Sequence, residues 1–400
     1  MENLLILKFG GSVLEDEKTI RNSAELVKSL LNQGYKLVIV VSALKGATDT
    51  LLNMAKRLNP NSPPKLLSEI LAMGERTSVR LFSNALQGKG LDAIFIDPSS
   101  DIWPIITDSD YLDANPLMDE IKKKSVEIIK LLKGGKIPII CGFIGKNEKG
   151  EITTLGRGGS DTTAVILGSA LEAKEVVLIK DVSKVYSSDP DKVDNPLPLE
   201  SLNSEEAYIL ASSGSKFLHS KALKYKDDKL IIRVSSLEQG LKGTVIEGVM
   251  DFKVEAYGEP CMMVTLIKTK DSKYSDIAGL IGKIEYYGGK ILSLTLNEVA
   301  IVLYLTGTSK IVNEIHNYSI LSGFGKAVSV FEKLRMITVK GTFFEKVPGL
   351  IQKVTQPLAK EGINIYGLNT ISSSIKLFVS DEDCYKALKL IKEVLGLGKD

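Results

Sequence analysis

The first 250 residues alternate short apolar runs with amphipathic stretches. The apolar runs are rich in β-branched residues, and the stretches between them repeat apolar positions at helical spacing. Continuous apolar runs of this kind indicate parallel strands that helices cover on both faces. We therefore predict an α/β domain with a doubly wound, mostly parallel sheet. The expected strands lie within 4–9, 36–43, 91–97, 136–145 and 175–181, and the expected helices within 18–33, 64–88, 116–133 and 161–173.

The remaining 150 residues show a different pattern, in which one order of elements occurs twice. Each copy has roughly 65 residues and reads β-α-β-β-α with room for a final strand, as in a split βαβ unit. We expect one α/β domain at 1–249 and two ferredoxin-like units at 250–332 and 333–400.

Composition excludes several classes of protein. Lys plus Arg number 51 and Asp plus Glu 49, so the net charge of +2 gives no basic field for nucleic acid. The three cysteines and two histidines are scattered, which argues against a zinc site or a disulfide framework. We expect no metal site built from protein side chains. No apolar run approaches the roughly 18 residues of a membrane span, and the N-terminus does not resemble a signal peptide. We expect a cytoplasmic protein.

Glycines and charges follow the predicted strands, at the edge where open α/β sheets bind ligands. After the first strand, Gly10 and Gly11 could donate backbone N–H groups to a phosphate, with Ser12 adding a hydroxyl and Lys8 a cation. A tight turn with a surface lysine is the alternative for this motif alone. The Walker loop and the dinucleotide fingerprint are both missing, so a phosphate site here is of another kind.

The segment "TTLGRGGSDTTA" at 153–164 is more informative. Its three glycines can form a concavity lined by N–H groups, with Ser160 or Asp161 capping the helix that follows. Arg157 would then be held at the mouth of an anion site, where its planar fork suits a carboxylate. The alternative, a simple cap beside a solvated arginine, explains neither the three glycines nor their arrangement around Arg157.

Other residues are less distinctive. Glu75 follows a glycine inside a predicted helix, and a glycine there costs about 1 kcal/mol, which hints at close approach by another segment. An exposed acid is the alternative. Lys216 and Lys221 are expected to be solvated, and His219 to be structural. The loop with Tyr186 could wrap a nucleoside.

Nine segments follow one another along the chain in a characteristic order: "KFGGS" at 8–12, "VSALKGATDTL" at 41–51, "GERTS" at 74–78, "GFIG" at 142–145, "TTLGRGGSDTTA" at 153–164, "KDVSKVYSSDP" at 180–190, "SEEAYILASSGSKFLH" at 204–219, "IIRVSS" at 231–236 and "VPGLIQKVTQPLAKEGINIYGLNT" at 347–370. Taken together, these motifs resemble the aspartokinases, within the amino acid kinase superfamily. The resemblance covers essentially the whole chain, and the C-terminal repeats look like the paired ACT domains with which aspartokinases bind end-product amino acids.

The resemblance implies transfer of the ATP γ-phosphoryl group to the side-chain carboxylate of L-aspartate. The products would be ADP and 4-phospho-L-aspartate, the first step toward lysine, threonine and methionine. An aspartate carboxylate is already ionised at neutral pH, so the reaction needs no general base. Catalysis would consist of positioning and of positive charge placed between two anions.

The resemblance also implies roles for individual residues. Lys8 would stabilise the transferring phosphoryl group, and Asp161 would orient Lys8 or share the ammonium of the substrate. The ATP phosphates would be bound by Gly10, Gly11 and Ser12. Arg157 would bind a carboxylate of the substrate aspartate and Glu75 its ammonium, while Thr48 and Ser160 would help to position this substrate. The nucleotide, with Mg²⁺ between its phosphates, would be contacted by Asp181, Tyr186 and Lys216. Lysine or threonine is the expected effector, bound between ACT-like units of a homodimer or a dimer of dimers.

Several positions depart from the usual aspartokinase pattern. Lys180 stands where threonine is usual, Ser220 where proline is usual, and Asp191 where arginine is usual, all on the nucleotide side. The ligand loops of both repeats, at 273–282 and 369–374, also differ from the family pattern.

Two other functions are compatible with parts of this pattern. One is a glutamate or acetylglutamate kinase of the same superfamily. Glu75 disfavours the acetylated acceptor, because an acid is useful for a free ammonium and useless for an acetylated amine, and the tandem ACT-like repeats also favour aspartate. An amino-acid sensor with an inert first domain is disfavoured because Lys8, Arg157 and Asp161 are all retained.

Overall fold

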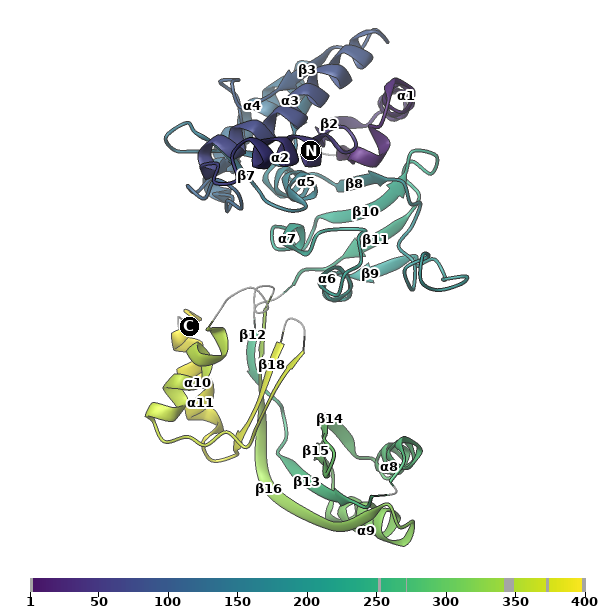
Figure 1. Ribbon diagram of the computed structural model, residues 1–400, viewed down its shortest axis with the longest axis vertical. Helices are drawn as coiled ribbons and strands as arrows, with labels where there is room; N and C mark the ends of the chain where they lie inside the picture. The colour runs from purple at the N-terminus through teal and green to yellow at the C-terminus, as the bar shows by residue number, and fades with distance from the viewer. Residues whose placement is uncertain (1–2, 251–252, 271, 342–348, 372–373, 398–400) are drawn as a thin grey trace. The chain divides into compact units, whose positions relative to one another are not determined.

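The structure is a computed structural model that describes residues 3–250, 253–270, 272–341, 349–371 and 374–397. The chain forms two compact units, Met1–Met250 and Asp251–Asp400, and each is described by itself (Figure 1).

The first unit is built on a sheet whose strand order, among the described residues, is β3-β5-β2-β1-β8-β10-β11-β9. The neighbours from β3 to β10 are all parallel, and only the β10–β11 pair is antiparallel. The predicted mostly parallel sheet is therefore confirmed. Its strands are β1 (Leu4–Phe9), β2 (Lys36–Val41), β3 (Ala93–Ile96), β5 (Ile137–Cys141), β8 (Glu175–Lys180), β9 (Ser201–Asn203), β10 (Ile231–Ser236) and β11 (Thr244–Glu247).

A second, small sheet in this unit has the order β4-β6-β7. Its strands are β4 (Ile106–Thr107), β6 (Ile144–Asn147) and β7 (Ile152–Thr154). The chain passes from the last of these strands directly into the glycine-rich turn and the helix that follows it.

Helices cover the large sheet because each helix has an apolar face and the strands are apolar on both faces. Packing helices on the sheet buries all of these apolar surfaces away from water. All six residues of β1 are buried, as expected for a central strand flanked by β2 and β8. The helices are α1 (Glu17–Asn32), α2 (Ala47–Leu58), α3 (Pro64–Gln87), α4 (Met118–Lys133), α5 (Gly159–Ala170), α6 (Ser204–Ser212) and the short α7 (Ser220–Leu223), with the 3₁₀ turn η1 at Gly11–Val13.

Helix α5 is the most deeply buried of these helices, with every residue from Gly159 to Ser169 inside the protein. Its sequence is small or apolar on all sides, which is what a helix surrounded by protein requires. Gly168 lets it approach the sheet, since a Cβ there would lie 2.6 Å from a methyl group of Val176 on β8. This close packing fixes the N-terminus of α5 relative to the end of β8.

The second unit contains an antiparallel sheet with the order β14-β15-β13-β16-β18-β17, and β12 pairs with the far half of β16. One apolar core of this sheet lies under α8 and α9, another lies under α10 and α11, and a further apolar cluster is formed by residues of the strands themselves. The elements are β12 (Lys253–Ala256), β13 (Cys261–Lys268), α8 (Tyr274–Tyr286), β14 (Lys290–Leu296), β15 (Ala300–Thr306), α9 (Ser309–Leu321), β16 (Gly325–Lys340), α10 (Leu350–Lys360), β17 (Gly367–Ile371), β18 (Ser374–Ser380) and α11 (Cys384–Val394).

The two repeats share one strand. The expected border at 332–333 lies inside β16, which pairs with β13 of the first repeat and then with β18 of the second. β12, which precedes the first repeat, pairs with the second-repeat half of β16, and its Val254 packs in the second core with Ile337 and Val339. The first repeat is thus inserted between two strands of the second. The division into two ACT-like domains at 250–332 and 333–400 stays a prediction.

None of the helices in the described residues combines the length and the apolar character that crossing a bilayer demands.

Candidate active site

Three charged side chains meet at the carboxyl ends of β1 and β8. The Lys8 Nζ lies 2.7 Å from Oδ1 of Asp161, and the Lys180 Nζ lies 3.0 Å from Oδ2 of the same carboxylate. β1 and β8 are adjacent parallel strands, so their ends bring the two lysines together over the N-terminus of α5. Lys8 thus contacts Asp161, the residue expected to orient it, and Lys180 joins the cluster although no role in the site was expected for it.

Burial and the neighbouring charges act on this cluster in opposite directions. Desolvation opposes ionisation of Asp161, but Lys180 and Lys8 outweigh it and hold the pKa of this carboxyl well below its usual range. Burial lowers the pKa of Lys8, Asp161 raises it, and Lys180 lowers it further. The ionised carboxylate of Asp161 thus lies between two lysines in a site shielded from water.

Glu75 lies on α3 and is 3% exposed. Its Oε1 accepts a hydrogen bond of 3.0 Å from the Ala43 N–H, while its Oε2 is buried without a hydrogen-bond partner in the described residues. Burial raises the pKa of Glu75 to about 7, against the lowering effect of Ala43 and Lys8. An unpartnered buried carboxylate oxygen is costly, so this atom is well suited to receive a ligand donor such as an ammonium group.

Gly74 explains why a helix interior carries a glycine beside this glutamate. A Cβ at Gly74 would lie 2.8 Å from the Cβ of Ala43 and 3.8 Å from Oγ1 of Thr48. The missing side chain lets α3 approach the turn after β2, and that approach places Glu75 against the Ala43 N–H. The close contact inferred from the sequence is confirmed, and Glu75 is not an exposed acid. Thr48, half-buried at the start of α2, lies on the same turn.

The glycine-rich turn between β7 and α5 requires its glycines. Gly156 and Gly158 have φ of 72° and 69°, in the left-handed region that favours glycine. A Cβ at Gly156 would overlap Asp113, and one at Gly158 would overlap His219. Arg157, between them, is exposed and makes no hydrogen bond or ion pair within the described ranges. Its guanidinium is therefore available to a ligand, next to the buried Ser160 and Asp161.

The "KFGGS" turn offers fewer amides than expected. The Gly10 N–H donates to the carbonyl of Ile179 at 3.2 Å and so is used within the protein. Gly11 and Ser12 begin the 3₁₀ turn η1, where the first N–H groups have no acceptor within the helix. A Cβ at Gly10 would lie 3.4 Å from the Lys8 Nζ. Gly10 thus brings the start of this turn close to the Lys8 ammonium, and the N–H groups of Gly11 and Ser12 follow it in the chain.

The residues expected to face the nucleotide lie after β8 and before α7. Asp181 and Lys216 are exposed, and Tyr186 is half-buried and forms an isolated bridge with Pro198. No hydrogen bond or ion pair joins these three to one another in the part of the chain that the structure describes. Their roles stay predictions.

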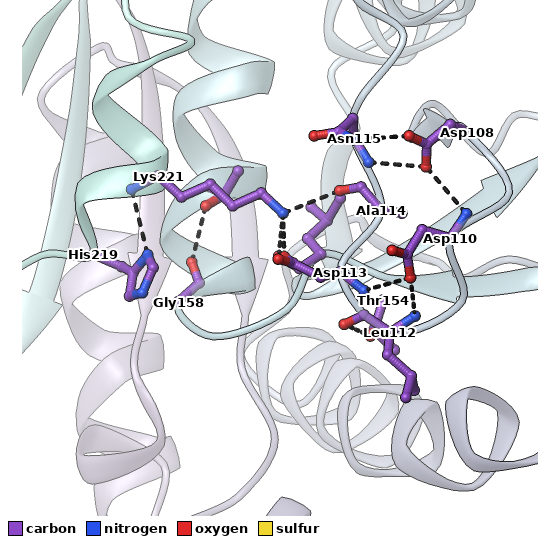
Figure 2. A network of polar contacts seen from close by, with 12 residues as sticks. Asp108, Asp110, Leu112, Asp113, Ala114, Asn115, Thr154, Gly158, His219 and Lys221 are labelled. Carbon is purple, nitrogen blue, oxygen red and sulfur yellow. Dashed lines mark hydrogen bonds and ion pairs between the residues drawn. The ribbon is translucent and has the colours of Figure 1, made fainter. Parts of the chain in front are cut away.

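Lys221, on α7, contacts the segment at 113–114 and the residue that precedes the glycine-rich turn (Figure 2). Its Nζ donates to the carbonyls of Leu155 at 2.8 Å and Ala114 at 3.1 Å, and pairs with Asp113 at 2.5 Å. The Nδ1 of His219, which caps α7, accepts from the Lys221 N–H at 3.3 Å. His219 is structural, as expected. Lys221 was expected to be solvated, and this was wrong: it is 7% exposed because its helix is buried, a burial that its apolar neighbours at 217–218 and 222–223 could have indicated.

The donor set fits a metal ion that arrives with the nucleotide. Among the described residues there is no group of three His, Cys, Asp or Glu side chains placed to hold a metal. Mg²⁺ commonly takes one or two carboxylates together with substrate phosphates and waters. Both oxygens of Asp161 are paired with lysines, whereas the exposed Asp181 follows directly after β8. Asp181 thus offers an exposed carboxylate on the side of β8 where the nucleotide is expected.

Comparison with known proteins places this site in a family. A model of the amino acid kinase family matches residues 3–234, more than half of the chain. The aspartate kinase Ask_LysC of Stutzerimonas stutzeri (strain A1501) is 30% identical over 96% of this chain and 95% of its own. Aspartokinase 2 of Bacillus subtilis (strain 168) is 29% identical over 99% of this chain and 98% of its own. The crystal structure of aspartate kinase from Synechocystis, 24% identical, has a similar fold, with a TM-score of 0.80 over 99% of this chain and 71% of that one. The chain therefore belongs to the amino acid kinase family, and within it to the aspartokinases.

Proposed function

We propose that this protein transfers the γ-phosphoryl group of ATP to the side-chain carboxylate of L-aspartate at the Lys8–Asp161 cluster. The observation that carries the proposal is the pair of lysines held on one buried carboxylate, beside a glycine-rich turn, an arginine available to a ligand and an unpartnered glutamate oxygen. Two anions must meet for this reaction, and fixed cations in a site shielded from water are what lowers its barrier.

The amino acid would be held by both of its ends. The Oε2 of Glu75 lacks a partner and would accept the substrate ammonium, with Thr48 on the neighbouring turn. The Arg157 guanidinium would bind a carboxylate, next to Ser160, because its planar fork matches that group. Two charged contacts on one small molecule would fix its orientation toward the phosphate.

The chemical step needs no proton transfer. One oxygen of the side-chain carboxylate forms a bond to the γ-phosphorus, the bond from that phosphorus to the β,γ-bridging oxygen breaks, and its electron pair leaves on ADP. Lys8 would neutralise the oxygens of the group in transit, with Asp161 fixing the position of the Lys8 ammonium. When bound, Mg²⁺ supplies further neutralisation of the phosphates.

The nucleotide would be held from the side of β8 and α7. The N–H groups of Gly11 and Ser12 would donate to its phosphates, in the turn that Gly10 closes. Asp181, Tyr186 and Lys216 would face the rest of the nucleotide and its Mg²⁺. This arrangement would place the γ-phosphate next to Lys8, since Gly10 packs against the Lys8 ammonium.

The second unit would regulate the enzyme. The paired ferredoxin-like repeats support binding of lysine or threonine between ACT-like units, and the outer strands β14 and β17 offer edges for a second copy of the chain. A homodimer or a dimer of dimers would bring such edges together. Calorimetry with each amino acid tests this, and no heat of binding from either would remove the proposal.

The decisive experiment is an acceptor screen. The enzyme is incubated with ATP and Mg²⁺ and with L-aspartate, L-glutamate or N-acetyl-L-glutamate, and the acyl phosphate is trapped with hydroxylamine. We expect product with aspartate alone, and none from a Lys8→Met variant that unfolds at the same temperature as the wild type. Product with acetylglutamate in place of aspartate would support the alternative kinase and refute the role given to Glu75.

A further inference from the structure

Lys180 is a half-buried lysine that shares the carboxylate of Asp161 with a second lysine. Its side chain is 14% exposed at the last position of β8, and its Nζ lies 3.0 Å from Oδ2 of Asp161. The other oxygen of that carboxylate already pairs with Lys8 at 2.7 Å. One carboxylate balances one ammonium, so the second lysine adds a positive charge that Asp161 does not balance.

Such an excess is unfavourable unless a further anion enters the site. Taking an ammonium group out of water costs several kcal/mol, and two ammonium groups on one carboxylate also repel each other. Glu75 does not remove the imbalance below neutral pH, because burial favours its protonated form. A Cβ at Gly10 would lie 3.4 Å from the Lys8 Nζ, so the glycine leaves room for an anionic group to approach this ammonium.

We propose that Lys180 is a second catalytic cation, whose ammonium contacts the phosphoryl group as it passes from ATP to L-aspartate. The inference rests on the proposed function and assigns it a further residue. Asp161 holds both ammonium groups from one side through its two oxygens, so that each keeps N–H groups free for the group in transit. The bond changes are those given above, and Lys180 gives up no proton.

The test compares Lys180→Met, which keeps the length of the side chain without its charge, with Lys180→Arg, which keeps the charge. The matched control is Lys174→Met, at an exposed position just before the opposite end of β8. For each variant, kcat and the KM values for ATP and L-aspartate are measured by release of ADP. Affinities for ADP alone and for ADP with aluminium fluoride and L-aspartate are measured by calorimetry, and folding is followed by thermal unfolding.

We expect Lys180→Met to lower kcat about 100-fold, as removal of one donor to a transition state does, with KM for L-aspartate within about 3-fold. The affinity of Lys180→Met for ADP with aluminium fluoride and L-aspartate should fall together with kcat, while its affinity for ADP alone should be unchanged. Lys180→Arg should recover most of kcat. Lys174→Met should behave as wild type. The inference is overturned if kcat of Lys180→Met stays within about 3-fold of the wild-type value. It is also overturned if the variant loses affinity for ADP alone as much as for the aluminium fluoride complex, or if its lower kcat results from unfolding. Failure of the wild type to phosphorylate L-aspartate would instead overturn the proposed function.

Discussion

We predict that the buried carboxyl of Glu75 makes both the free energy of unfolding and the binding of L-aspartate depend on pH. The change is Glu75→Gln, which keeps an acceptor for the Ala43 N–H and the shape of the side chain but removes the charge. In the wild type, burial raises the pKa of Glu75 from 4.5 to about 7. The folded state therefore holds this proton up to about pH 7, whereas the unfolded chain releases it near pH 4.5.

The sign of the effect on stability follows from proton counting. Between pH 4.5 and about 7 the folded state binds more protons than the unfolded state, so the free energy of unfolding falls as the pH rises. A shift of this size corresponds to a loss on the order of 3 kcal/mol. Glu75→Gln should remove that loss, and the variant should be the more stable protein at pH 8 when no substrate is present.

Substrate binding should change in the opposite direction. The substrate ammonium needs the ionised form of Glu75, so KM for L-aspartate in the wild type should rise as the pH falls below about 7, by nearly 10-fold per unit. In Glu75→Gln this dependence should disappear, and KM at pH 8 should be about 10- to 100-fold higher because a charge-assisted hydrogen bond is lost.

The measurements are urea unfolding and steady-state kinetics from pH 5.5 to 8.5. Glu69→Gln serves as the control, since Glu69 lies on the same helix and has no comparable burial. An unchanged KM for L-aspartate in Glu75→Gln at pH 8 would refute the role given to Glu75. Parallel stability profiles for the variant and the wild type would refute the raised pKa.

Three further substitutions test the positions around the site. Gly74→Ala should lower the free energy of unfolding by about 1–3 kcal/mol despite the better helix propensity of alanine, because its Cβ would overlap Ala43; a more stable variant in urea would contradict the close packing of α3. Lys221→Met should lower the free energy of unfolding by about 2 kcal/mol, because the carbonyl of Leu155 and other acceptors lose a buried donor. An unchanged urea midpoint would show that this contact does not stabilise the fold. Arg157→Ala should raise KM for L-aspartate at least 10-fold with KM for ATP within about 2-fold; equal increases in both would assign Arg157 to phosphate instead.

Much of the first unit could be predicted from the sequence because its signals are local. The β-branched runs at β1, β2, β5 and β8 indicate strands buried on both faces, and such strands are usually parallel. Gly74 was informative for the same reason, since a glycine within a strong helical pattern is costly unless another segment lies against it.

What the sequence did not reveal depends on pairings between distant segments. Lys180 was only a departure from the family pattern, because nothing near it indicates that β8 ends beside Asp161. Lys221 looked like one of many lysines, because its partners lie at 113–114 and 155. The same holds for β12, whose pairing with β16 spans some eighty residues, and so the order of strands in the second unit differs from a simple tandem repeat.

The most direct test of the central claim is to determine which carboxylate of L-aspartate is phosphorylated. The enzyme is given ATP, Mg²⁺ and L-aspartate in the presence of hydroxylamine, and the trapped product is identified by mass spectrometry and NMR. The account predicts the β-hydroxamate, formed in the wild type and lost in Lys8→Met. The α-hydroxamate, or an equal yield of the β-hydroxamate from Lys8→Met, would contradict it.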